Sequence, residues 1–254
     1  MKLLQAFVIA IAMYSKIPMP KMDWKEEDMG YVFCFFPVIG IFIGVLSVCV
    51  GTFLFRKEVP TFFLAVLMTL LPLVVTGGIH LDGYMDTQDA LASYGDRKKK
   101  LEILKDPNTG AFAVIRVCCY FLWNMAVWLL LKEEMAIVLT GSIYVISRAM
   151  SGFSVVGFPS AKAEGTVSMF QKAANRIVVK VVMIGYFIGS FAMLFVMEWE
   201  VALVVFLISV LFFGYYYKMS KKQFGGITGD LAGYFLQMAE LLMLTGVLVG
   251  KYLF

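Results

Sequence analysis

The sequence predicts an all-α integral membrane protein, a polytopic helical bundle of about seven transmembrane helices with a short helix at its N-terminus. Of its 254 residues, 61% are hydrophobic and only 16% are charged, whereas soluble domains are about 45–50% apolar and about 25% charged. The apolar residues also come in long blocks, and the mean hydropathy is +0.83. A soluble chain of this length could not bury so much apolar surface, so a soluble globular protein is excluded.

The apolar blocks define the expected helices in chain order. The first block, 3–14, is short for a bilayer core that needs about 20 residues per helix. We therefore expect it to lie at the interface or to form a re-entrant segment. Each of the seven longer blocks is predicted to span the membrane, and the whole chain, 1–254, is expected to form one membrane domain. These blocks are 31–55, 61–81, 111–131, 135–157, 177–197, 199–217 and 231–250.

The loops between these blocks alternate in charge. Most of the 22 basic residues lie in the long loops 15–30, 82–110, 158–180 and 218–230, whereas the opposite side has only Arg56, Lys57, Lys132 and Lys251. Because basic loops stay in the cytoplasm, we expect the four long loops to be cytoplasmic. The net charge of +4 is too small to indicate nucleic-acid binding, and no nucleic-acid partner is expected.

An acidic segment, GGIHLDGYMDTQD, occupies residues 77–89. The spacing of Asp82, Asp86 and Asp89 places the three carboxylates on one face of a helix, where like charges repel. Mg²⁺ prefers such oxygens and is typically held by one or two carboxylates together with substrate phosphates. We therefore predict that these aspartates bind Mg²⁺, with a solvated acidic helix end as the alternative. His80, in the same segment, is the only histidine of the chain.

A glycine-rich stretch, GGITGD (225–230), opens the last apolar block. Glycines let a backbone approach a ligand closely and expose N–H groups to phosphate oxygens, and a helix N-terminus favours anions. Thr228 and Gly229 are therefore candidate phosphate contacts, and Asp230 could supply a further metal ligand. A helix cap and turn is the alternative interpretation of this stretch.

Two charged residues lie well inside apolar blocks: Arg148 in 135–157 and Glu240 in 231–250. Such groups are costly in a membrane and are usually paired or functional, so Arg148 is a candidate substrate or phosphate contact. Arg97 and Lys105, which lie in the basic loop 82–110, could neutralise the charge of a bound phosphate. Together these features indicate metal-assisted phosphoryl transfer at a cytoplasmic active site formed by loops 82–110, 158–180 and 218–230.

Residues 77–90 (GGIHLDGYMDTQDA) resemble the GGxHLDGLaDTxDG signature of the cobalamin synthase family, the adenosylcobinamide-GDP ribazoletransferases. SKIPMP (15–20), LEILKDPNTG (101–110), Ser147-Arg148 and GGITGD follow the family's order, so the resemblance covers essentially the whole chain. It implies an enzyme of the prokaryotic cytoplasmic (inner) membrane that requires Mg²⁺. The family joins adenosylcobinamide-GDP to α-ribazole, or its 5′-phosphate, and releases GMP, giving adenosylcobalamin or its 5′-phosphate.

The resemblance also implies roles for single residues. Asp230 would bind metal or position the nucleophile. His80 would orient a carboxylate or act as a general base, with an interfacial histidine in a structural hydrogen bond as the alternative. Gln237 stands where the family has an acid, so Glu240 would carry the remaining catalytic role. The implied partners are the two substrates and the lipid bilayer, and a homo-oligomer is compatible with the sequence. The implied metal ligands are Asp82, Asp86 and Asp89.

Two other functions fit parts of the pattern. A CDP-alcohol phosphotransferase of phospholipid synthesis would also use Mg²⁺ and interfacial aspartates, but its DxxDGxxAR pattern is absent. A transporter or cation channel would place acids at several span centres, and many transporters contain inverted repeats. Here the acids cluster in loops, and no such repeat is evident.

Overall fold

The computed structural model describes residues 2–20 and 26–254, and within these ranges it is helical, without β-strands. The predicted fold class, a polytopic bundle of membrane helices, is confirmed. In chain order the elements are α1 (Lys2–Tyr14), the 3-10 helix η1 (Glu26–Phe35), α2 (Phe36–Arg56), α3 (Thr61–Thr76), α4 (Ile79–Ala92), α5 (Arg97–Ile103), α6 (Ala111–Leu130), α7 (Glu134–Thr140), α8 (Ile143–Gly157), α9 (Thr166–Ala173), α10 (Arg176–Met197), α11 (Trp199–Gln223) and α12 (Gly229–Leu253).

Six stretches of the described chain are long and apolar enough to cross a membrane: Met29–Arg56, Ala111–Leu130, Glu134–Gly157, Arg176–Met197, Trp199–Gln223 and Gly229–Leu253. A seventh span depends on α3 and α4, which together pass the same test but are bent by 99° at their junction. The predicted continuous span 61–81 is therefore wrong in one respect, because its helix ends at Thr76. The first apolar block forms the short helix α1, as predicted.

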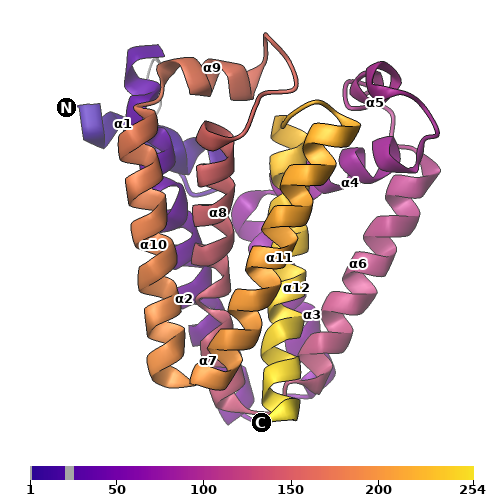
Figure 1. The fold of residues 1–254 in the computed structure, drawn as a ribbon. Helices are drawn as coiled ribbons and strands as arrows, with labels where there is room; N and C mark the ends of the chain where they lie inside the picture. Colours follow the sequence, from indigo (N-terminus) through magenta and orange to yellow (C-terminus); the bar gives the residue numbers. More distant parts are fainter. Residues whose placement is uncertain (1, 21–25) are drawn as a thin grey trace.

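The elements α1, α4, α5 and α9 gather at one end of the bundle, and the C-terminus lies at the other end (Figure 1). The segments predicted as long loops on one side thus share one end, although 21–25 fall outside the described residues. The loops 82–110 and 158–180 are largely helical, since they contain most of α4, all of α5 and all of α9. That this end faces the cytoplasm stays a prediction.

At the opposite end, acidic residues pair with two of the four basic residues, Arg56 and Lys251. The guanidinium of Arg56 lies 2.5 Å from a carboxylate oxygen of Glu134, and Lys251 lies 2.8 Å from Glu133 and 2.9 Å from Glu198. These pairs compensate positive charge at this end. Among the described residues, basic side chains without an ion pair are therefore more numerous at the end that carries α4, α5 and α9.

Helix α8 lies at the centre of the bundle, with nearly every side chain buried. Helix α2 approaches it through Gly40 and Gly44, where any larger side chain would collide with the carbonyl groups of Tyr144 and Gly141. Small residues four apart allow such close contact between membrane helices. Helices α10 and α11 instead expose long apolar faces, as expected of helices that face lipid.

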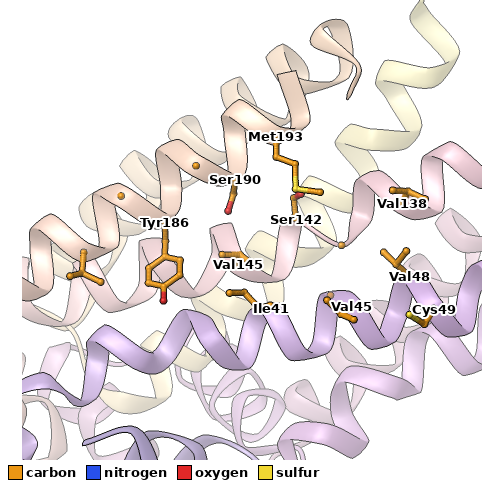
Figure 2. Close-up of a pocket in the computed structure, with 15 residues that line it drawn as sticks. Ile41, Val45, Val48, Cys49, Val138, Ser142, Val145, Tyr186, Ser190 and Met193 are labelled. Carbon is orange, nitrogen blue, oxygen red and sulfur yellow. The ribbon is translucent and has the colours of Figure 1, made fainter. Parts of the chain in front are cut away.

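A cavity of about 680 Å³ lies between α2, α7, α8 and α10. Figure 2 shows that its wall is formed by side chains such as Ile41, Val45, Val145 and Met193. The lining contains no carboxylate and no basic side chain. This cavity is suited to apolar groups and cannot be the site of phosphate chemistry.

Candidate active site

Two consecutive glycines turn the chain at the start of the acidic segment. Gly77 and Gly78 have φ angles of +67° and +79°, in the left-handed region that commonly ends a helix and favours glycine. The side chain of Lys16 lies over Gly77, and its backbone N–H donates to the carbonyl of Val75 at 2.8 Å. This turn ends α3 and sends α4 off at 99°, so the two helices do not continue as one straight span.

Helix α4 then runs in close contact with α12. A methyl group on Gly83 would lie 2.8 Å from the carbonyl oxygen of Asp230, and one on Gly233 would lie 2.8 Å from that of His80. The two backbones touch because both contact positions lack a side chain. Asp82, which precedes Gly83, is thereby placed beside Asp230 from a distant part of the sequence.

The aspartates of this contact form an electrostatic cluster. Partial burial, followed by the negative charges of Asp82, Asp230 and Asp89, raises the pKa of Asp86 to about 6. Such mutual repulsion is relieved when a cation binds between carboxylates. This chemistry fits a divalent cation.

The described residues contain no group of three or more His, Cys, Asp or Glu side chains that could together hold a metal ion. Asp82 is exposed, and Asp86 and Asp230 are partly exposed, so solvent reaches all three side chains. Mg²⁺ bound through one or two carboxylates completes its shell with water and substrate phosphates. The arrangement is compatible with such a site and does not resemble a closed structural metal centre.

Asp89 lies at the far end of the acidic stripe and has a different neighbour. Its carboxylate packs against Gly110, the N-cap of α6, where a larger side chain would collide with it. A carboxylate is favourable at a helix N-terminus. This contact gives a structural reason for an aspartate at position 89. The role of Asp89 as a metal ligand stays a prediction.

The glycine-rich turn is held by both capping and backbone pairing. The Thr228 hydroxyl accepts from the backbone N–H of Leu231 at 3.2 Å and donates to Asp230 at 3.3 Å. Ile227 pairs with the chain at Pro159 and Ala161 through two backbone hydrogen bonds of 2.9 Å. Thr228 is thus engaged as a cap, whereas Gly229 is exposed with open space around its Cα. The predicted phosphate contacts of both residues stay predictions.

The predicted phosphate-binding residues of loop 82–110 lie on and after α5. Arg97 donates to the carbonyl of Lys221 at 3.4 Å, and the buried Lys100 donates to the side chain of Gln223 at 2.5 Å. These bonds attach α5 to the end of α11. Arg97 and Lys105 are otherwise exposed, so they remain available to an anion.

Lys162 is a further residue of the site, and the sequence did not indicate it. It lies close enough to Asp230 for a favourable charge interaction, although its position in a basic loop indicated only membrane topology. No local signal distinguishes Lys162 from the other loop lysines.

The two charges inside the bundle pair with each other. Arg148 and Glu240 form an ion pair of 2.7 Å between α8 and α12, with side chains only 1% and 8% exposed. Glu240 also accepts from the Ser147 hydroxyl at 2.8 Å. One turn before it, Gln237 accepts from the Tyr120 hydroxyl at 2.6 Å. Mutual pairing accounts for the presence of Arg148 and Glu240 in apolar spans, and their predicted substrate-binding and catalytic roles stay untested.

A second cavity, of about 220 Å³, adjoins the carboxylate cluster. Asp82 and Asp230 line it together with His80, whose ring is 5% exposed and stacks on Tyr14 with centroids 6.1 Å apart. The Nε2 atom of His80 is buried without a hydrogen-bond partner among the described residues.

Fold and site together define a polytopic membrane enzyme with its polar chemistry at one end of the bundle. Comparison with known proteins identifies which one: the family model described as cobalamin-5-phosphate synthase matches residues 6–248. The chain therefore belongs to the cobalamin-5-phosphate synthase family, and it is a transferase of cobalamin biosynthesis.

Curated relatives agree over nearly the full length. An adenosylcobinamide-GDP ribazoletransferase of Lachnoclostridium phytofermentans is 41% identical over 99% of this chain and 96% of its own. Proteins of the same name are 31% identical in Clostridium perfringens strain SM101, over 96% of both chains, and 32% identical in a Geobacillus species, over 92% of this chain and 91% of its own. No solved structure matches the chain. Family membership argues against the lipid phosphotransferase and transporter alternatives.

Proposed function

We propose that this protein joins adenosylcobinamide-GDP to α-ribazole, or to its 5′-phosphate, with release of GMP, and that the reaction requires Mg²⁺. The relatives' names indicate the two substrates. The observation that carries the chemistry is the glycine contact between α4 and α12, which places Asp82 beside Asp230. We also propose that this end of the bundle faces the cytoplasm from the inner membrane.

In the proposed step, a hydroxyl oxygen of ribazole forms a bond to the phosphorus attached to cobinamide. The bond from that phosphorus to the GMP oxygen breaks, and the hydroxyl proton passes to a base. A bound Mg²⁺ would neutralise the phosphate oxygens and the leaving GMP. Asp82 and Asp86 would hold the ion, with Asp89 at the end of the same stripe.

The remaining residues would act by position and charge. Asp230, beside Asp82 and near Lys162, would orient the attacking hydroxyl. The open N-terminus of α12 at Gly229 would bind a phosphate oxygen, and Arg97 and Lys105 would attract the anionic substrate. Arg148 and Glu240 would fix α8 against α12, because a paired buried charge locks the geometry of the two helices.

The test uses purified protein in nanodiscs with both substrates, and it follows GMP release and corrinoid product against Mg²⁺ concentration. We expect metal-dependent product from the wild type. Asp82→Asn should lose at least about 10²-fold in rate, because it removes a charge that binds the ion. The matched control is Asp96→Asn at the exposed N-cap of α5, where Asn caps equally well and activity should persist.

Two outcomes would contradict this proposal. Product formation that persists after chelation of divalent ions would remove the requirement for Mg²⁺. Full activity of a folded Asp82→Asn protein would remove Asp82 from the metal site.

A further inference from the structure

The cavity beside the carboxylates has an aromatic wall that the proposed chemistry does not use. We call it the aromatic cavity; its rings are Tyr14, Phe33, Phe36, His80 and Phe170. They come from α1, η1, α2, α4 and α9, and Figure 1 shows α1 and α9 at the same end of the bundle as α4. Phe33 meets Phe170 edge-on at 4.9 Å and Phe36 at 5.9 Å, the favoured arrangement of aromatic pairs.

The aromatic cavity is amphipathic. Phe33, Phe36 and Phe170 are at most 3% exposed, whereas Asp82 at its other side is exposed. A ligand that fits both sides has a planar apolar part for the rings and a polar part for the carboxylates. A nucleoside with an apolar base has this shape.

Size and polarity distinguish among the groups of the two substrates. At about 220 Å³, the cavity is smaller than the roughly 300–1,000 Å³ of sites that hold a whole drug-sized ligand, so a corrinoid ring does not fit. Guanine carries donors and acceptors on several edges, and the phenylalanine rings would leave them unpaired at a cost. A bicyclic base with few polar atoms avoids this cost.

His80 is a buried polar residue of the cavity wall. The residue lines the cavity, and its Nε2 is buried without a hydrogen-bond partner among the described residues. Buried polar atoms are normally paired, so a ligand atom that bonds to this nitrogen is favoured. A ring nitrogen of a bicyclic base has a lone pair in the plane of the base and would accept a hydrogen bond from this nitrogen.

We propose that the aromatic cavity binds the base of the ribazole substrate, with a ring nitrogen hydrogen-bonded to His80 and the ribose directed toward Asp82 and Asp230. This proposal rests on the proposed function, which supplies ribazole as a substrate. It assigns the ribazole-specific part of the site to α1, η1, α2 and α9. The nucleotide of the other substrate then remains outside the cavity, near the basic residues of α5.

The test introduces a larger side chain into the cavity from helix α9. Val167 is 6% exposed and lines the cavity, so Val167→Phe places a ring where the base would lie. Val181→Phe is the matched control, because Val181 is 63% exposed on α10. Ribazole binding to each protein in nanodiscs is measured by equilibrium dialysis without the second substrate. The KM values for ribazole and for adenosylcobinamide-GDP are then measured separately.

We expect Val167→Phe to weaken ribazole binding and to raise its KM by at least about tenfold, because the added ring would occupy the space of the base. The KM for adenosylcobinamide-GDP should change less than the KM for ribazole. If Val167→Phe does not fold, Val155→Phe fills the same cavity from α8.

Unchanged ribazole binding in a folded cavity-filling variant would overturn the proposal, and so would an effect confined to adenosylcobinamide-GDP. Absence of ribazole binding to the wild type would also overturn it. The wild type could bind ribazole and yet form no corrinoid product, while Val167→Phe no longer binds ribazole. This result would support the cavity assignment and refute the proposed reaction.

Discussion

The contact between α4 and α12 can be tested with one added methyl group. In Gly83→Ala the new carbon would lie 2.8 Å from the carbonyl oxygen and 2.9 Å from the Cα of Asp230, whereas ordinary contact begins at 3.4 Å. The backbone cannot rotate away as a side chain can, so the helices must separate by about 0.6 Å. A misplacement of about 1 Å can cost about 10²-fold in rate, and we expect Gly83→Ala to lose about tenfold to 100-fold in kcat.

The assay is GMP release by purified protein in nanodiscs at saturating substrates, with the thermal unfolding midpoint measured in parallel. Gly233→Ala should behave similarly, because its methyl group would meet the carbonyl of His80 from the opposite helix. The control is Gly214→Ala on α11, which has open space around it and should gain up to about 1 kcal/mol of helix stability. If a folded Gly83→Ala protein kept the wild-type kcat, the close contact would not be what aligns the carboxylates.

Three further predictions concern stability, each measured as a thermal unfolding midpoint in nanodiscs. Glu240→Gln should destabilise the protein by about 3–5 kcal/mol because it leaves Arg148 buried without a counter-charge, and the double change Arg148→Met with Glu240→Leu should recover most of the loss; no recovery would show that the pair has a further role. Thr228→Ala should cost about 1 kcal/mol through the lost cap of α12, and Thr228→Ser should restore it, whereas equal midpoints would show that the cap contributes nothing. Gly77→Ala should also be destabilising, because alanine is strained at a φ of +67° and its methyl group would collide with Lys16; an unchanged midpoint would count against this strain.

The sequence by itself determined the features that depend on local composition. The length of each apolar run predicted the membrane helices, since a bilayer of fixed thickness needs a fixed number of apolar residues. The spacing of Asp82, Asp86 and Asp89 predicted a single carboxylate face, because the helical period is local. The motif HLDGYMDTQDA pointed to the family before any coordinate was known.

Only the tertiary structure decided which residues meet. The hydropathy pattern predicted a continuous span over 61–81. In the structure the chain turns at Gly77 and Gly78, which both have left-handed backbone angles. Gly83 and Asp230 stand far apart in the sequence and touch in the fold, and Arg148 likewise meets Glu240. Periodicity describes one helix at a time, whereas the contacts that build this site arise between helices and depend on how their surfaces fit.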